Sequence, residues 1–572
     1  MSQKEFADTI FTGGNIFTMD DAKPECEAVA VKGATILAVG RKDDVFKFSG
    51  PSTTVIDLEG KTMFPGFIEP HQHAIMAALF SCLPSISGYE CFSYAEVKAR
   101  IMKGINAVDP SQSPLGWGVT FGWDPELIRD LPALDAKFIA KEFSADIPVL
   151  IIAQNGHAAW CNLKAFEVSG IDSSVQDSSD AVYGHEEDGS LSGEVWESGA
   201  ILNLISHVPK SPDADPTKLL IDQWKAYASY GFTTVTELGY TPNPPVDEIV
   251  VKMSKNKDCP IRLGLYNLVG EISDVGTTKP IAEPTEMLWE AGIKLIADGS
   301  THCGTAGLVD PYLDTEMTKI LSFPPPPSNG LVLHTPENLY KIVRYYHERN
   351  IQVATHAHGD RTCQEVVDAY EKVMKDCKTP TDVRHRIEHC GLMTPEQIAR
   401  AAKLNIAMSF FVDHLYYYAT SYTNDILGPE RTNRWTPISV ATEHGAKWTI
   451  HQDHPTYPGH ARPFANIKTA VTRTQRDDPK TVYGEEYKAT LNEALKAYTI
   501  NAAWQLRKEK ELGSLEVTKK ADLLIISDNP HKMDPFKLEE IKVVDTYIGG
   551  RSTNQTAMTE KNKRGKQVKV YA

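Results

Sequence analysis

Long apolar runs, CxxC cysteine pairs and an excess of basic residues are all missing from this sequence of 572 residues. No apolar run approaches the roughly 20 residues that a membrane-spanning helix needs. The first ten residues carry acidic side chains where a signal peptide has a basic start and an apolar core, so we expect a cytoplasmic protein. The net charge of −16 argues against nucleic acid and anionic membranes as partners.

The nine cysteines are expected to be reduced thiols, because none lies in a CxxC pair. Cys82, Cys303 and Cys390 are expected to pack rather than react. No Walker loop or dinucleotide fingerprint occurs at a strand–helix junction, so no nucleotide cofactor is implied. With 41% apolar and 23% charged residues, the composition is that of an ordinary globular protein, long enough for a barrel and smaller lobes.

Two histidines follow a short apolar run and stand two residues apart, in the sequence His71-Gln72-His73. Residues i and i+2 of a strand point the same way, so a strand that ends here brings two imidazoles to one point. Two nitrogen ligands at one point suit a divalent metal such as zinc. The alternative is a pair of solvated histidines at a strand end.

Four further apolar runs end in a candidate ligand. Lys294 lies in the first, the second ends at His356 or His358, and the third ends at His389. The last run is followed by Asp453 and by a proline that cannot continue a central strand. The intervals from one run to the next fit one or two strand–helix–strand units of about 30 residues.

Helical patterns lie between these runs, for example at Pro336–Arg349 and Thr394–Lys403. Alternating strands and helices predict an α/β fold with a parallel sheet that helices cover. In a TIM-like (β/α)8 barrel of this kind, catalytic residues lie at the carboxyl ends of the strands, where the candidate ligands fall.

Nine motifs occur in order along nearly the whole chain: PGFIEPHQH from Pro65, GWD from Gly122, NGHAAWCN from Asn155, GIKLIADGS from Gly292, HAHGD from His356, RIEHC from Arg386, HQDHP from His451, LNEALKAYTINAA from Leu491 and GSLEVTKKADLLIIS from Gly513. Together they resemble the amidohydrolase superfamily. More narrowly, they resemble its YtcJ-like and N-substituted formamide deformylase-like branch, amidohydrolase family 3.

The resemblance implies a metallo-hydrolase site with one or two divalent metals, of which zinc is the first expectation. By this resemblance His71 and His73 hold one metal, and His356 and His389 hold the second. Asp453 matches an aspartate that touches the metal and acts as a general base.

Lys294 matches a lysine that can be carboxylated to bridge two metals, a role that a free ammonium cannot fill because it binds no cation. The alternative for Lys294 is a salt bridge to Asp298 or to another acid. His358 is expected to pack behind His356, which the resemblance favours as the ligand.

The implied reaction is hydrolysis of a carbon–nitrogen bond in a small non-peptide amide, such as an N-acyl or N-formyl amine or a carbamate. Metal-bound hydroxide attacks the carbonyl carbon, and Asp453 passes the proton to the leaving nitrogen. His157 either stabilises the tetrahedral oxyanion or only orders its loop.

Other functions stay open at this stage. The same site chemistry serves an aminohydrolase, which releases ammonia, and an esterase or lactonase. A catalytically inactive binding or scaffold protein is the alternative from a different class, since fold alone does not settle function. The resemblance also implies a homodimer or a larger homo-oligomer.

Short alternating runs near both ends of the chain predict strands, at Thr9–Phe11, Ala28–Val31, Thr35–Gly40, Ala521–Ser527 and Val543–Ile548. Strands at opposite ends of a chain leave exposed edges unless they pair with one another. We therefore expect a small β-sandwich from residues 1–62 and 505–572, with a barrel of residues 63–504 inserted between its halves.

About 220 residues separate His73 from Lys294, where three strand–helix units need only about 90. We expect an insertion at about 80–220 that forms a cap lobe over the barrel, with aromatic residues including Trp117, Phe121, Trp123, Trp160 and Trp196. A second aromatic cluster, Phe410–Phe411 and His414–Tyr418, is expected on a strand and its loop. These aromatics either belong to the core or line a pocket for a substrate with an apolar or aromatic substituent.

Overall fold

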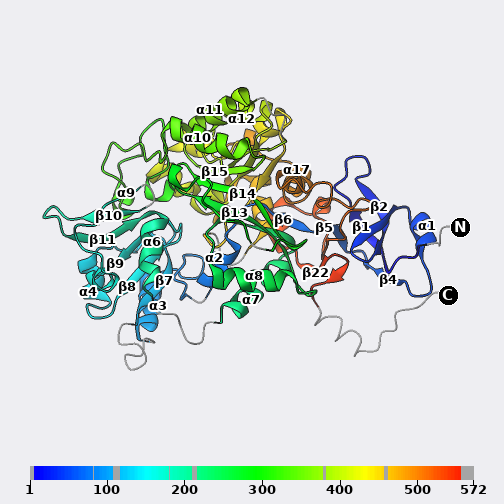
Figure 1. Ribbon diagram of the computed structural model, residues 1–572, viewed down its shortest axis with the longest axis horizontal. Coiled ribbons are helices and arrows are strands. Elements are labelled where there is room, and N and C mark those ends of the chain that lie inside the picture. The colour runs from blue at the N-terminus through cyan, green and yellow to red at the C-terminus, as the bar shows by residue number, and fades with distance from the viewer. Residues whose placement is uncertain are drawn as a thin grey trace.

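A computed structural model describes residues 5–81, 83–106, 116–178, 181–208, 215–281, 283–377, 382–456 and 461–554. Cys82 lies outside the described residues. Three large sheets organise this part of the chain, with a barrel sheet in the middle and one further sheet on either side of it (Figure 1).

The barrel sheet consists of eight strands, and each hydrogen-bonds to its neighbours in parallel. In spatial order they are β6 Phe67–Glu69, β12 Phe232–Tyr240, β13 Arg262–Val269, β14 Leu288–Ile296, β15 Val353–Ala357, β16 Arg386–His389, β17 Ala407–Phe410 and β18 Trp448–Ile450. The sheet curls until its first and last strands approach: the His73 N–H, beyond β6, donates to the His454 carbonyl, beyond β18, at 2.9 Å.

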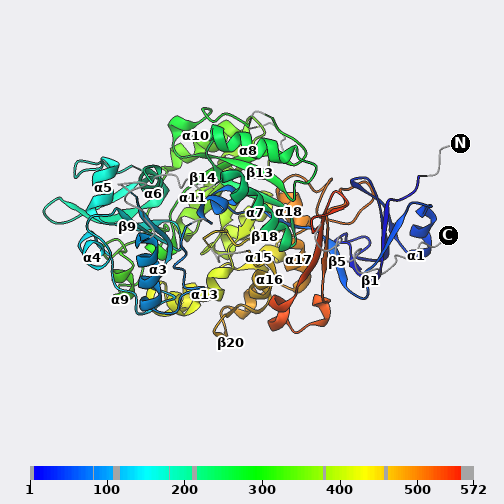
Figure 2. The ribbon, with the colours of Figure 1, turned by 90° about the horizontal axis from the view of Figure 1, so that it is seen from below.

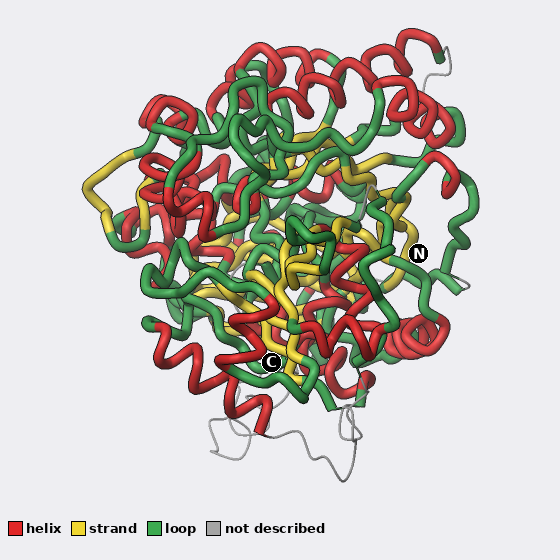
Figure 3. The backbone as a smooth tube through the Cα atoms, turned by 90° about the vertical axis from the view of Figure 1, so that its left-hand side faces the viewer, coloured by secondary structure: helices red, strands yellow, loops and turns green. Residues whose placement is uncertain are grey.

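Helices surround the strands of the barrel (Figure 3). They include α2 Ala74–Phe80, α7 Pro216–Ser229, α8 Pro244–Ser254, α10 Pro336–His347, α11 Asp360–Asp376, α12 Pro395–Lys403, α15 Ile438–Glu443, α16 Pro463–Thr472, α17 Leu491–Ala497 and α18 Ile500–Gln505. Thr335 and Thr394 cap α10 and α12 by accepting a hydrogen bond from the third residue of each helix. The two helices predicted from the sequence are thus confirmed.

The inserted lobe, residues 94–206, forms a sheet of its own on the side of the barrel away from the chain ends (Figures 1 and 2). Its strands run in the order β10 Val182–His185, β11 Leu191–Trp196, β9 Ala158–Cys161, β8 Val149–Ala153 and β7 Gly118–Trp123, and its helices are α3 Tyr94–Asn106, α4 Ala136–Glu142, α5 Leu163–Ser169 and α6 Glu197–Ser206. Trp117, Trp123 and Trp160 pack in the two apolar cores of this lobe.

The second aromatic cluster lies in a helix rather than in the expected loop. Strand β17 ends at Phe410, and α13, Asp413–Ser421, carries His414–Tyr418. Its three consecutive tyrosines are all buried and pack in an apolar cluster that also contains Trp435. Burial, which a single sequence does not reveal, decides between helix and loop here.

Strands from both ends of the chain form the third sheet, in the order β23 Arg551–Ser552, β22 Val543–Ile548, β21 Leu523–Ile526, β5 Thr62–Pro65, β1 Thr9–Phe17, β2 Glu25–Lys32 and β3 Thr35–Gly40, with β4 Thr54–Asp57 on β1. The five predicted terminal strands are confirmed. Antiparallel pairing of β5 with β21 joins the two halves. The sandwich form and the domain limits stay predictions.

The described cysteines are all free thiols. Cys303 and Cys390 are buried, as expected, and burial raises the pKa of Cys303 to about 12, so its thiol stays protonated at neutral pH. Within the described ranges, no helix combines the length and the apolar character needed to cross a membrane.

Candidate metal centre

The predicted ligands gather at the carboxyl edge of the barrel sheet. His71 and His73 follow β6, Lys294 lies near the end of β14, and His356 lies near the end of β15. His389 ends β16, and Asp453 comes three residues after β18. The two histidines of the His-x-His pair therefore lie just beyond their strand, and His73 is the residue before α2.

One group of possible ligand atoms joins His71, His389 and Asp453, all buried and within 4.8 Å of one another. The Nε2 atoms of His71 and His73 lie 3.2 and 3.3 Å from the same atom, Asp453 Oδ1. This carboxylate oxygen thus lies between the two histidines that the sequence places on one metal.

A second group joins His356, His358 and His389, again within 4.8 Å of one another. His356 Nε2 lies 3.1 Å from the Gly299 carbonyl oxygen, a hydrogen bond that assigns its proton to Nε2 and leaves the lone pair on Nδ1. The His358 ring stacks on the His389 ring, with centroids 4.6 Å apart. The structure therefore places His358 beside the predicted ligands.

A divalent metal fits these residues, because four of their buried polar atoms have no hydrogen-bond partner: His71 Nε2, His358 Nδ1, His389 Nδ1 and Asp453 Oδ1. Unpaired buried polar atoms are rare in folded proteins, since each costs about 1–3 kcal/mol of stability. Imidazole nitrogens and a carboxylate oxygen are ligands that zinc and similar cations take.

Glu388 and Arg386 position His71. Both Glu388 and His71 are fully buried, and His71 Nδ1 hydrogen-bonds to Glu388 Oε2. Arg386 donates to both oxygens of Glu388, at 2.6 and 2.8 Å. Burial alone would raise the pKa of Glu388, but Arg386 and His71 hold it well below its usual value. The ionised carboxylate fixes the His71 ring, with Nε2 toward Asp453.

Asp453 is also ionised. Burial favours its neutral form, but the adjoining His71 and His73 keep the pKa of this carboxyl well below its usual value. A carboxylate in this state can accept a proton or bind a cation.

Lys294 is buried and does not form the salt bridge to Asp298 that the sequence left open: no acid lies within ion-pair distance of its ammonium among the described residues. Asp298 instead accepts hydrogen bonds from the backbone N–H groups of Gly307, His358 and Gly359. Burial lowers the pKa of Lys294 to about 8, against the pull of Glu388 and Asp453. The neutral amine is the form that reacts with carbon dioxide.

His157 comes from the inserted lobe and reaches the barrel edge, with its ring 5.7 Å from the His356 ring. Its Nδ1 lies 2.8 Å from Glu197 Oε2, and Glu197 also accepts a hydrogen bond from Thr305 Oγ1 at 3.1 Å. Burial would lower the pKa of His157, but the negative charge of Glu197 raises it. The protonated ring is therefore favoured beside the candidate metal ligands.

Sequence reasoning missed Glu197 and the buried pair of Arg386 and Glu388. For that pair the sequence held a usable pattern, because opposite charges two residues apart in a buried strand share a face and need each other. Glu197 offered no such pattern. It is placed by a left-handed backbone, with φ of 66°, that few residues other than glycine adopt.

The sequence was compared with models of known protein families. The family model described as "Amidohydrolase family" matches residues 54–553. The chain belongs to the amidohydrolase family. The resemblance drawn from the nine motifs is thereby confirmed, and with it a metal-binding hydrolase.

Two relatives in this family match almost the whole chain. The putative amidohydrolase YtcJ of Bacillus subtilis is 26% identical over 95% of this chain and 98% of its own. The N-substituted formamide deformylase of Arthrobacter pascens is 24% identical over 96% of this chain and 98% of its own.

The fold agrees with that of a solved metal-dependent hydrolase. An uncharacterized metal-dependent hydrolase from Pyrococcus horikoshii superposes with a TM-score of 0.69, at 20% identity over 92% of this chain and 99% of the other. This likeness and the curled parallel sheet confirm the predicted TIM-like α/β barrel.

Proposed function

We propose that this amidohydrolase cleaves the carbon–nitrogen bond of a small non-peptide amide, and that N-substituted formamides, other N-acyl amines and carbamates are its substrate class. The set of four unpartnered atoms on His71, His358, His389 and Asp453 carries the proposal, because it provides a buried place for a divalent metal at the carboxyl edge of the barrel. The name of the formamide deformylase relative adds the substrate class.

The proposed metal ligands are His71, His73 and Asp453 for one zinc ion, and His356 and His389 for a second. Lys294, if carboxylated, would bridge them; its lowered pKa supports this modification because the free amine is the nucleophile toward carbon dioxide. When bound, a divalent metal supplies a water of lowered pKa and polarises a carbonyl.

Asp453 is the proposed general base. Its ionised carboxylate takes the proton of the attacking water and returns it to the leaving nitrogen, so that the amine leaves neutral. His157, held by Glu197, donates a hydrogen bond to the oxygen that becomes negative during attack. One such donor is typically worth about 3 kcal/mol in the transition state.

The test combines metal analysis with product analysis. Protein grown and purified with bicarbonate should hold two zinc equivalents, and Lys294→Ala and His71→Ala should each hold one or fewer. The loaded enzyme should release formate and a substituted amine from an N-substituted formamide. Release of ammonia from an amidine-like ring would instead indicate an aminohydrolase. Full metal loading without turnover of any amide, ester or amidine would indicate a binding or scaffold protein.

A further inference from the structure

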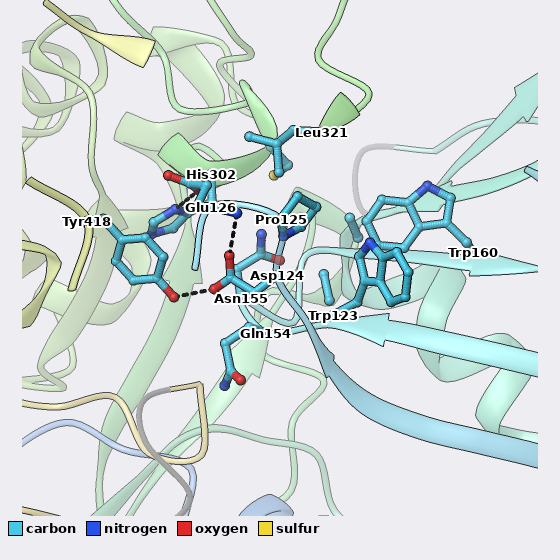
Figure 4. Close-up of a pocket in the computed structure, with 13 residues that line it drawn as sticks. Trp123, Asp124, Pro125, Glu126, Gln154, Asn155, Trp160, His302, Leu321 and Tyr418 are labelled. Carbon is cyan, nitrogen blue, oxygen red and sulfur yellow. Dashed lines mark hydrogen bonds and ion pairs between the residues drawn. The ribbon is translucent and has the colours of Figure 1, made fainter. Parts of the chain in front are cut away.

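A small recess lies where the inserted lobe meets the barrel (Figure 4). The lobe contributes Trp123, Asp124 and Glu126, from the end of β7 and the turn after it, and the barrel contributes His302 and Tyr418. The cavity volume is about 20 Å³, which is room for one group the size of a water molecule.

Glu126 presents an unused acceptor in this recess. Its side chain is buried, with 5% of the residue exposed, and Oε1 accepts a hydrogen bond from His302 Nδ1 at 2.6 Å. Oε2 has no hydrogen-bond partner. A buried carboxylate oxygen left unpaired is costly, so a ligand that brings an N–H donor to it is favoured.

Two carboxyl groups, of Asp124 and Glu126, line the recess. The Asp124 carboxyl accepts hydrogen bonds from the Glu126 N–H, at 3.0 Å, and from the Tyr418 hydroxyl, which Figure 4 shows directed at it. Burial, and then the charge of Glu126, raise the pKa of Asp124 to about 7. No lysine or arginine is among the described residues that line the recess.

Aromatic rings complete the lining. Trp123 and Trp160 lie on one side of Asp124 and Tyr418 on the other (Figure 4). Aromatic faces attract cations, whereas the small volume excludes a bulky apolar substituent. The small volume of the recess, its carboxyl groups and the free Glu126 Oε2 therefore all favour a compact cation with N–H groups as the ligand.

The recess adjoins the candidate metal centre. Asn155 lines it, and His157, two residues on, contacts the His356 ring. On the barrel side, His302 stacks on His414 with centroids 5.0 Å apart, and His414 contacts His358 at 5.3 Å. A short series of packed side chains therefore separates the recess from the candidate metal centre.

We propose that this recess binds a primary ammonium group of the substrate, with Glu126 as the main acceptor and Asp124 beside it. The inference rests on the proposed amide hydrolysis and narrows it to amides that carry an ammonium group at some distance from the scissile bond.

Binding of n-butylammonium to the zinc-loaded full chain, measured by isothermal titration calorimetry, tests the recess without requiring turnover. The neutral analogue 1-butanol serves as the ligand control. We expect wild type to bind butylammonium at least tenfold more tightly than 1-butanol, and Glu126→Gln to lose that preference. Glu485→Gln, at a side chain that is 79% exposed, should behave as wild type.

Equal binding of both ligands, or undiminished butylammonium binding by Glu126→Gln, would overturn the proposal and leave the recess as a water site. Circular dichroism checks the fold of Glu126→Gln. If Glu126→Gln does not fold, Asp124→Asn, which keeps the shape of its side chain, is used in its place.

Substrates extend the test to catalysis. N-(4-aminobutyl)formamide and N-pentylformamide differ only in an ammonium or a methyl group at the same position. Pairs with spacers of three to six methylenes vary the distance between this group and the formamide. For the best spacer, we expect the ratio of kcat/KM values, ammonium over methyl, to exceed ten in wild type and to fall at least tenfold in Glu126→Gln. A ratio unchanged by that substitution would overturn the proposal. If neither formamide is hydrolysed, the proposed function fails while the calorimetric result on the recess stands.

Discussion

Buried side chains around the candidate metal centre have pKa values that burial and neighbouring charges shift in different directions. Asp453 and Glu388 are kept ionised by basic neighbours, whereas burial shifts Lys294 toward its neutral amine. His157 is shifted the other way, toward its protonated form, by Glu197. The directions of these pKa shifts suit the base, metal-bridging and anion-stabilising roles proposed for Asp453, Lys294 and His157.

Asp453→Asn tests the proposed general base. The amide keeps the size of the side chain but is a poor proton acceptor, so we expect kcat to fall about a hundredfold or more. Zinc content should change little, because the histidine ligands remain. Steady-state kinetics and elemental analysis of the same preparation measure both quantities, and near-normal turnover would contradict the assignment.

Glu197→Gln tests the positioning of His157. The raised pKa of His157 means that its protonated form is present below that pKa and is lost as the pH rises through it. Removing the charge of Glu197 lowers this pKa, so the alkaline fall in kcat/KM should move to lower pH. The pH profile of wild type and variant is the measurement, and an unmoved alkaline limb would show that His157 acts in another way.

The candidate ligands could be found from the sequence because each ends an apolar run, and the parallel sheet brings such ends together. The charge states could not be found in this way. They depend on burial and on neighbours far away in the chain, as with Glu197, which is 40 residues from His157.

At the scale of strands and helices, the candidate site lies at the carboxyl ends of the barrel strands, where the regular strand conformation ends. His389, at the end of β16, and Asp453, three residues after β18, have φ values of 72° and 52°, in the left-handed region. Such a conformation costs a non-glycine residue about 1 kcal/mol or more and persists only where the surroundings enforce it.

The elements themselves were predictable to different degrees. Helices α10 and α12 have polar caps and a clear apolar face, and the sequence revealed both. Helix α13 has a run of buried tyrosines with no polar face, so its periodicity gave no indication of a helix.

A pair of buried histidines links α10 to the segment before β16. His347 Nδ1 lies 3.0 Å from His385 Nε2, and His385 Nδ1 accepts a hydrogen bond from the Val353 N–H. Burial, and then the nearby His347, lower the pKa of His385 to about 3. The folded protein thus holds this ring neutral.

His385→Gln should make unfolding less sensitive to acid. As the pH falls below about 6.5, His385 binds a proton in the unfolded chain. In the folded chain it stays neutral until about pH 3. In that window the group removes about 1.4 kcal/mol of stability per pH unit. Urea unfolding at pH 7 and pH 5 should therefore differ less in His385→Gln than in wild type, whereas the exposed His444→Gln should match wild type.

At the scale of the whole molecule, one buried ion pair ties the barrel to the terminal sheet. Arg262, at the start of β13, donates to both oxygens of Asp522, at 2.8 and 3.2 Å. Both side chains are almost fully buried, and Asp522 also accepts from the Gly549 N–H. The two parts should therefore unfold together.

Asp522→Ala should lower the free energy of unfolding by about 3–5 kcal/mol, because it leaves the Arg262 charge buried without a partner. Adding Arg262→Met should restore part of the loss. Asp44→Ala, which breaks exposed pairs with Arg41 and Lys47 in the helical turns after β3, should cost less than about 1 kcal/mol. Equal effects of Asp522→Ala and Asp44→Ala in urea unfolding would contradict the coupling.

The pairing of β5 with β21 also imposes a delay during synthesis, because the two strands are far apart in the chain. Strand β5 ends at Pro65 and its partner begins at Leu523, so at about 5–20 residues per second the ribosome needs roughly 25 to 90 s to supply the partner. During that interval the β5 edge is open while the barrel forms. Strands β1–β4 can pair with one another in that interval, but β5 stays exposed to chaperones and to other unpaired strands until β21 has been made.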